Sequence, residues 1–168
     1  MSLDHRTRLV GAALALASVL ALATDEFALL KEERIGPLRL DLPEQEVERR
    51  VACKPHRGPV TPSDVDGDYY QEWAYPACGI RLDMGAATPK GRQTISSITI
   101  TRPSSWKTGR GIGIGSTERE VIAAYGRDRE RETSVPGERL VAGTVYGGLV
   151  FTFAAGRVTQ IFLGAAAE

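Results

Sequence analysis

The sequence predicts an α+β fold, in which two tandem units, each a short helix followed by an antiparallel meander, form one sheet with the helices on one face. Two observations support this prediction. Three blocks of sequence recur in the same order in the two halves of the chain, and the segments that resemble strands alternate apolar with polar residues. Alternation with a period of two is typical of a sheet that is covered on one face only.

The repeat is clearest where "LRLDLPEQEVERRV", starting at Leu38, aligns without gaps on "IGIGSTEREVIAAY", starting at Ile112. Further along, "CGIRLDM" matches "GGLVFTF", and "ISSITI" matches "VTQIFL". The shared order of these blocks indicates an internal duplication. We expect a first unit over residues 24–105, which includes an N-terminal helical segment, and a second unit over residues 106–168.

Each unit begins with a helix, which we expect at Glu44–Val51 and at Glu118–Tyr125. Apolar residues four positions apart give each helix one narrow buried stripe. Thr117 and Glu120 fit a capping box at the start of the second helix, and Gly126 fits its end.

The strands predict an open sheet face that is available for binding. In "IRLDM" and "LVFTF" the apolar residues point to one face and the remaining residues to the other, and "YGGL" and "AAGR" fit hairpin turns. The strand "YYQEWAY" places its tryptophan and one tyrosine on a common face, which is either open or part of the core. The candidate binding residues are Arg81, Asp83, Ser97, Thr99, Thr101, Thr152, Gln160 and Phe162, together with Trp73 and Tyr75 if their face is open.

The first 23 residues have the layout of a secretory signal peptide. Arg6 and Arg8 precede an uncharged apolar run, and a small-x-small cleavage site ends at Ala23. The run is shorter than the ~20 residues that a membrane-spanning helix needs. We therefore expect cleavage after Ala23 and a periplasmic or secreted mature protein without a transmembrane segment. No Cys follows the run, so we do not expect a lipid anchor.

The charge of the mature chain is close to balanced. Of 21 basic and 21 acidic residues, cleavage removes Arg6, Arg8 and Asp4, which leaves 19 and 20. This balance does not favour nucleic acid or an anionic membrane surface as a partner. The expected partner is an envelope or secreted protein.

Two cysteines, Cys53 and Cys78, are the only ones in the chain. In an oxidising compartment an even pair predicts one disulfide. The alternative, a redox or nucleophilic thiol, lacks a C-x-x-C spacing and has only His56 as a mature histidine partner.

The stretches "LRLDLPEQEV" and "IGIGSTEREV" look like the apolar-x-Gly-x-Thr/Pro-x-x-Glu-Val helix entry of one superfamily. The chain thus resembles the β-lactamase-inhibitor-protein fold and the small outer-membrane-assembly lipoproteins of the SmpA/OmlA (BamE-like) family, over roughly Ile35 to Thr101 and Gly111 to Leu163. The sequence departs from that pattern in having Asp41 at the glycine position and no lipidation cysteine. The resemblance implies a protein-binding module, not a catalyst.

The glycine-rich stretch "GRGIGIGSTEREV" does not fit a phosphate-binding loop. The third glycine of G-x-G-x-x-G is missing in both registers. A P-loop needs Gly-Lys-Ser/Thr, but no lysine stands between Gly115 and Ser116. We expect instead a short edge strand at 112–114, a bend at Gly115 and a helix cap at Thr117. Asp41 and Pro43 would form the corresponding turn in the first unit.

The remaining chemical signals are weak. Asp64, Asp66 and Asp68 have the oxygen ligands that suit Ca²⁺, but they lack the EF-hand spacing, so cation binding and a solvated acidic turn both remain open. His56 lies in a proline-rich segment that we expect to be a loop, without a partner motif for catalysis. We predict no catalytic residue, no metal and no cofactor.

The sequence therefore predicts an exported, non-enzymatic protein-binding module of the bacterial envelope, of the inhibitor or immunity type. The first alternative is an outer-membrane assembly or maintenance factor. A small-ligand-binding protein or a hydrolase is a further alternative, which a pocket lined with carboxylates would favour.

Overall fold

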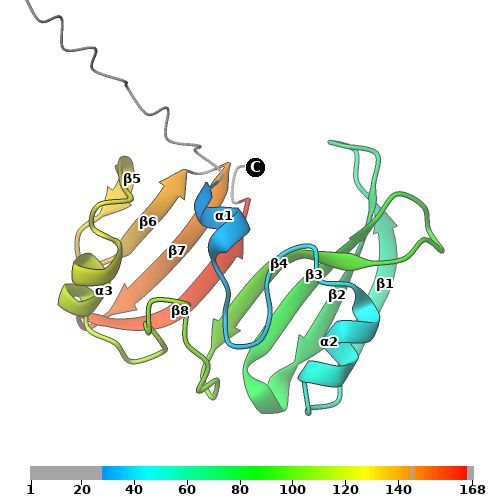
Figure 1. The fold of residues 1–168 in the computed structure, drawn as a ribbon, viewed down its shortest axis with the longest axis horizontal. Helices are drawn as coiled ribbons and strands as arrows, with labels where there is room; N and C mark the ends of the chain where they lie inside the picture. The colour runs from blue at the N-terminus through cyan, green and yellow to red at the C-terminus, as the bar shows by residue number, and fades with distance from the viewer. Residues whose placement is uncertain (1–27, 145, 166–168) are drawn as a thin grey trace, which may run out of the picture.

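The computed structural model describes residues 28–144 and 146–165, so the expected signal peptide lies outside the described residues. These residues form one antiparallel sheet of eight strands, with three α-helices and a short 3₁₀ helix (Figure 1). The elements are α1 (Ala28–Glu32), α2 (Glu44–Arg50), β1 (His56–Pro62), β2 (Tyr69–Tyr75), η1 (Pro76–Cys78), β3 (Ile80–Ala86), β4 (Thr94–Thr101), α3 (Glu118–Tyr125), β5 (Arg129–Val135), β6 (Arg139–Thr144), β7 (Gly147–Ala154) and β8 (Arg157–Gly164).

The strand order is β1-β2-β3-β4-β8-β7-β6-β5, so the sheet consists of two four-stranded meanders that meet where β4 pairs with β8. This arrangement confirms the predicted α+β class. In each half a helix precedes its four strands, as the sequence predicts. The hairpin expected at "AAGR" joins β7 to β8 through Ala155 and Gly156, and both residues have positive φ.

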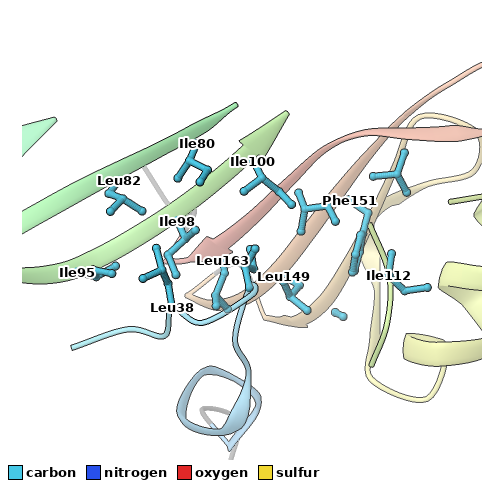
Figure 2. Close-up of a cluster of buried hydrophobic side chains, with 14 of the residues drawn as sticks. Leu38, Ile80, Leu82, Ile95, Ile98, Ile100, Ile112, Leu149, Phe151 and Leu163 are labelled. Atoms are coloured by element: carbon cyan, nitrogen blue, oxygen red, sulfur yellow. The ribbon is translucent and has the colours of Figure 1, made fainter. Parts of the chain in front are cut away.

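One face of the sheet carries the hydrophobic core, and Figure 2 shows side chains of neighbouring strands pointing to that side. The alternation of apolar residues along β3, β4, β7 and β8 produces this face. Val47 of α2 and Val121 of α3 are fully buried against it, and Leu29 of α1 packs at its margin. All three α-helices thus cover the same face, as Figure 1 also shows.

The first glycine of the glycine-rich stretch lies against a buried carboxylate. Glu33, which is 5% exposed, accepts hydrogen bonds from the Gly109 backbone N–H at 2.7 Å and from the Tyr125 hydroxyl at 2.6 Å. A Cβ on residue 109 would lie 2.6 Å from the Glu33 carboxylate oxygen Oε1. The segment after α1 is therefore tied to α3, and a glycine at position 109 leaves room for the carboxylate.

The rest of the stretch forms the turn into α3. Gly115 has φ +90°, and the predicted capping box is confirmed, because the Thr117 side chain accepts from the Glu120 N–H while the Glu120 carboxylate accepts from the Thr117 N–H. The edge strand expected at 112–114 is not formed. Only an isolated bridge between Lys107 and Gly113 is present, because two left-handed glycines bend the chain on either side of it.

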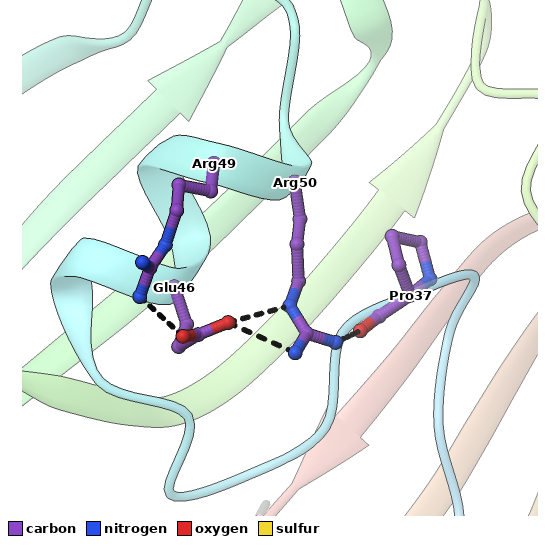
Figure 3. A network of polar contacts seen from close by, with 4 residues as sticks. All are labelled: Pro37, Glu46, Arg49 and Arg50. Carbon is purple, nitrogen blue, oxygen red and sulfur yellow. Dashed lines mark hydrogen bonds and ion pairs between the residues drawn. The ribbon is translucent and has the colours of Figure 1, made fainter.

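The first helix, α2, ends one residue earlier than expected, because Val51 has an extended backbone conformation. Its solvent-exposed side carries an ion-pair network (Figure 3). The Glu46 carboxylate pairs with Arg49 and, at 2.9 Å, with Arg50, which also donates to the Pro37 carbonyl. The hydrogen bond from Arg50 lowers the pKa of Glu46. The network fastens α2 to the segment that precedes it.

The predicted disulfide between Cys53 and Cys78 is confirmed, with 6.2 Å between the two Cα atoms. It connects the segment after α2 to η1. The expectation that His56 lies in a loop was wrong, because His56 begins the edge strand β1. The strand tolerates its prolines because β1 is the outermost strand and its free edge needs no hydrogen-bond donors there.

Candidate functional site

The open face of the sheet, opposite the helices, is the candidate binding surface. Residues that alternate with the core residues along each strand point to it. Ser97 and Thr99 are more than nine-tenths buried on this face, whereas Arg81 is exposed. The predicted residues that the structure brings together here are Arg81, Asp83, Ser97, Thr99, Thr101, Thr152, Gln160 and Phe162.

Trp73 and Tyr75 do not belong to the open face. Each is 1% exposed and lies in the core, because both alternate with open-face residues along β2. Trp73 is also covered by the Arg57 guanidinium, 3.9 Å from its ring centroid. Of the two possibilities for this strand, the buried one holds, and the two aromatic residues are not available to a partner.

The open face is hollowed by a cavity of about 690 Å³, here called the acidic cavity. Its walls come from the β1–β2 loop and from the centre of the sheet. Val65, on the loop, is 96% exposed at the rim. The lining residues are Ser63, Val65, Asp66, Tyr70, Asp83, Ser96, Ser97, Val150, Gln160, Phe162 and Ala165.

Two carboxylates of the acidic cavity are held in place by hydrogen bonds from hydroxyl groups. The Tyr70 hydroxyl donates to Asp66 at 2.6 Å, and the Ser97 hydroxyl donates to Asp83 at 2.5 Å. The bond from Tyr70 lowers the pKa of Asp66, and the same bond raises the pKa of Tyr70 to about 12. Asp66 is therefore ionised, and Tyr70 is protonated, at neutral pH.

A second cavity of about 320 Å³ lies on the same face, here called the basic cavity. Arg81 and Arg102 supply its charge. Arg81 approaches Glu72 at 3.8 Å, and both of these side chains are more than half exposed. The lining residues are Ala74, Pro76, Gly79, Ile80, Arg81, Thr99, Thr101, Arg102 and Gln160. Gln160 therefore borders both cavities.

The sequence pattern alone did not identify Tyr70, Val150 or Arg102 as site residues. The sequence singles out Asp66 only as a candidate cation ligand, whereas in the structure this residue lines the acidic cavity. The strand alternation would have placed Tyr70 on the open face, since Trp73 and Tyr75 belong to the core. Within residues 28–144 and 146–165, no group of three or more His, Cys, Asp or Glu side chains is arranged to hold a metal ion.

In the part of the chain that the structure describes, no helix has both the length and the apolar character needed to cross a membrane. No protein family model matches the chain, and no curated protein or solved structure matches it either. The resemblance to the β-lactamase-inhibitor-protein fold therefore remains a prediction from the sequence.

Proposed function

We propose that this chain is an exported, non-enzymatic protein-binding module of the bacterial envelope, and that the open face of the sheet is its binding surface. The observation that carries the proposal is the one-sided sheet. Its covered face is closed by three helices, whereas its other face is hollowed by two cavities lined with charged side chains, the acidic one also with two aromatic rings. Aromatic residues and arginine are enriched in protein–protein interfaces, and the rims of such interfaces are polar.

The geometry of the two halves supports a tandem duplication as the origin of this surface. Residues that the sequence alignment equates make the same backbone contacts: the Asp41 N–H donates to the Ile95 carbonyl, and the Gly115 N–H donates to the Val158 carbonyl. Asp41, at φ +59°, also shares the left-handed conformation of Gly115. The matching strand pairs β3–β4 and β7–β8 carry a register shift at equivalent places, after Asp83 and after Thr152.

The state of the acidic cavity favours binding over hydrolysis. A general acid at neutral pH needs a carboxyl group with a raised pKa. The hydrogen bond from Tyr70 lowers the pKa of Asp66 instead. We therefore propose that Asp66 acts as a fixed negative charge.

The test is site-specific photo-crosslinking in envelope extract with the mature chain, residues 24–168. A photoreactive phenylalanine replaces Val65 at the cavity rim, where the side chain is 96% exposed, and in a control variant it replaces Ile122 on α3, which is 43% exposed on the helical side. We expect a discrete protein adduct from position 65 and none from position 122. An adduct from position 122 alone, or no adduct from position 65, contradicts the proposal.

A charge reversal adds a second readout. Arg81→Glu alters the open face, and Arg119→Glu makes the same change on the exposed side of α3. We expect the first variant to weaken capture of the partner and the second to leave it unchanged. The identity of the captured protein then distinguishes an inhibitor of an enzyme from a factor that acts in outer-membrane assembly.

A further inference from the structure

We propose that the open face binds its partner through two opposite charges: a lysine or arginine side chain enters the acidic cavity, and a carboxylate of the same partner segment enters the basic cavity. This inference rests on the proposed function and adds the chemistry of the partner. It requires charges on the open face that a partner can reach. Arg81 is more than half exposed although it lies 3.8 Å from Glu72. The inference also requires that the positive and the negative charges lie apart.

The carboxylates of the acidic cavity are not neutralised by their surroundings. Among residues 28–144 and 146–165, neither Asp66 nor Asp83 forms an ion pair, and both accept hydrogen bonds from hydroxyl groups, Asp66 also from the Asp68 N–H. Glu72 lies directly opposite Asp83 in the β2–β3 register, and its exposed pair with Arg81, at 3.8 Å, offsets its negative charge only in part. Like charges opposite each other destabilise a sheet, so a bound cation would stabilise this arrangement.

The aromatic rings in the acidic cavity favour a lysine or arginine side chain as the bound cation. Tyr70 and Phe162 line the same cavity as the two carboxylates. A cation close to an aromatic face is attracted by the ring quadrupole, and a lysine or arginine stem adds apolar contact. A small inorganic cation lacks the apolar stem that would contact these rings.

Both cavities lie mainly on the first half of the sheet and share Gln160 of β8, beside the antiparallel pair β4–β8 where the two halves meet. β4 and β8 pair antiparallel with Thr99 opposite Phe162, two residues that the repeat alignment equates. The same alignment equates Arg81 of the basic cavity with Val150 of the acidic cavity. The position that aligns with Arg81 in the second half is thus uncharged, so the positive charge lies on one side of the centre, which would fix the direction in which a partner segment lies across it.

The separation of the charges fits an extended polypeptide. Arg81 and Asp83 are two residues apart on β3 and point to the same face, which corresponds to a spacing of about 7 Å. Side chains at positions i and i+2 of an extended partner segment have the same spacing. We infer a segment with one basic and one acidic residue separated by a single residue.

The probe is the blocked tripeptide acetyl-Lys-Ala-Glu-amide, titrated into the ¹⁵N-labelled mature chain and followed by NMR. We expect saturable shifts of the Gln160 side-chain amide, which borders both cavities, with a dissociation constant in the millimolar range. Replacing lysine by norleucine, or glutamate by glutamine, should weaken binding about two- to fivefold, as expected for the loss of a partly exposed ion pair.

Matched variants locate the charges. Asp83→Asn keeps an oxygen that can accept the Ser97 hydrogen bond but removes the negative charge, and it should weaken binding of the lysine peptide about two- to fivefold. Asp64→Asn makes the same change of net charge in the same loop that supplies Asp66, at a residue that does not line either cavity. It should leave binding unchanged.

Three results would overturn the inference. These are the absence of Gln160 shifts up to about 10 mM peptide, equal effects of Asp83→Asn and Asp64→Asn, and shifts caused by N,N′-diacetylchitobiose instead of the peptide, which would assign the cavity to a sugar. If crosslinking from position 65 still captures a protein, the proposed function stands while this inference falls. If no protein is captured, the proposed function itself falls.

Discussion

Tyr125→Phe removes one hydroxyl group from the contact between α3 and the segment after α1, and it should destabilise the protein by about 2–3 kcal/mol. Tyr125 is fully buried, and its hydroxyl lies 2.6 Å from the Glu33 carboxylate and 2.7 Å from the Thr108 hydroxyl. A hydrogen bond to a charged group contributes about 1.5–3 kcal/mol, and its loss leaves a buried carboxylate oxygen without that donor. Burial raises the pKa of Tyr125, so the hydroxyl remains protonated and available as a donor at neutral pH.

The assay is urea unfolding of the disulfide-bonded chain of residues 24–168, followed by tryptophan fluorescence, together with a thermal melt that gives Tm. The free energy of unfolding should fall without a change in the urea dependence, and Tm should fall by roughly 5–10 °C for a domain of this size. Tyr146→Phe is the control, because it deletes the same atom from a side chain that is 66% exposed. Equal stability of the two variants would refute the reasoning.

A second variant tests whether Gly109 and Tyr125 stabilise the fold through the same Glu33 carboxylate. Gly109→Ala would place a Cβ 2.6 Å from the Glu33 oxygen Oε1 and push the carboxylate from its position. Once the carboxylate has moved, removal of the Tyr125 hydroxyl should lower the free energy of unfolding by less than it does in the parent chain. We therefore expect the double variant to be more stable than the sum of the two single effects predicts, by at least about 0.5 kcal/mol. Strict additivity would show that the two residues act separately.

Three further outcomes are expected from unfolding measurements. Reduction of the disulfide, whose cysteines are 25 residues apart, should lower stability by about 3 kcal/mol, and an unchanged Tm under reducing conditions would contradict this. Burial raises the pKa of Tyr75 to about 12, as the Asp66 hydrogen bond does for Tyr70. Tyrosines of the unfolded chain ionise near pH 10, so the two protonated hydroxyls favour the folded state. Their contribution to the free energy of unfolding is fully present below about pH 10 and is lost as the pH rises to 12. A urea midpoint that does not change across that window would contradict this expectation. Gly115→Ala forces a Cβ onto a residue at φ +90° and should cost about 1–2 kcal/mol in urea unfolding; no measurable cost would show that the backbone relaxes there.

The sequence predicted those parts of the fold that depend on local patterns. The alternation in β3, β4, β7 and β8 predicted which side chains enter the core, and the Thr117–Glu120 spacing predicted the cap of α3. These features could be predicted from the sequence because each depends on residues within one strand or one helical turn. Composition and an even cysteine count were likewise sufficient for the disulfide.

The features of the fold and of the site that the sequence did not predict depend on contacts between segments that are far apart in the chain. Strand β1 contains two prolines and pairs only with β2, so nothing in its own sequence marks it as a strand. The acidic cavity needs the β1–β2 loop to lie beside β8, a neighbour that is about 100 positions away in the chain. Gly109 could not be recognised as the contact of Glu33, because the two residues are separated by 76 positions.

The turns before α2 and α3 both need a residue in the left-handed conformation, and the chain uses a different residue in each. Asp41 and Gly115 both adopt the left-handed conformation and both donate their N–H to the last meander strand of their own half. Glycine adopts this conformation at no steric cost, whereas aspartate is one of the few other residues that tolerates it. The glycines of the second half are therefore explained by backbone geometry and by the approach of Glu33. On the open face, by contrast, the aligned positions Arg81 and Val150, and Asp83 and Thr152, differ in charge although the strand pairs β3–β4 and β7–β8 shift register at matching places, so backbone geometry does not explain the charges there.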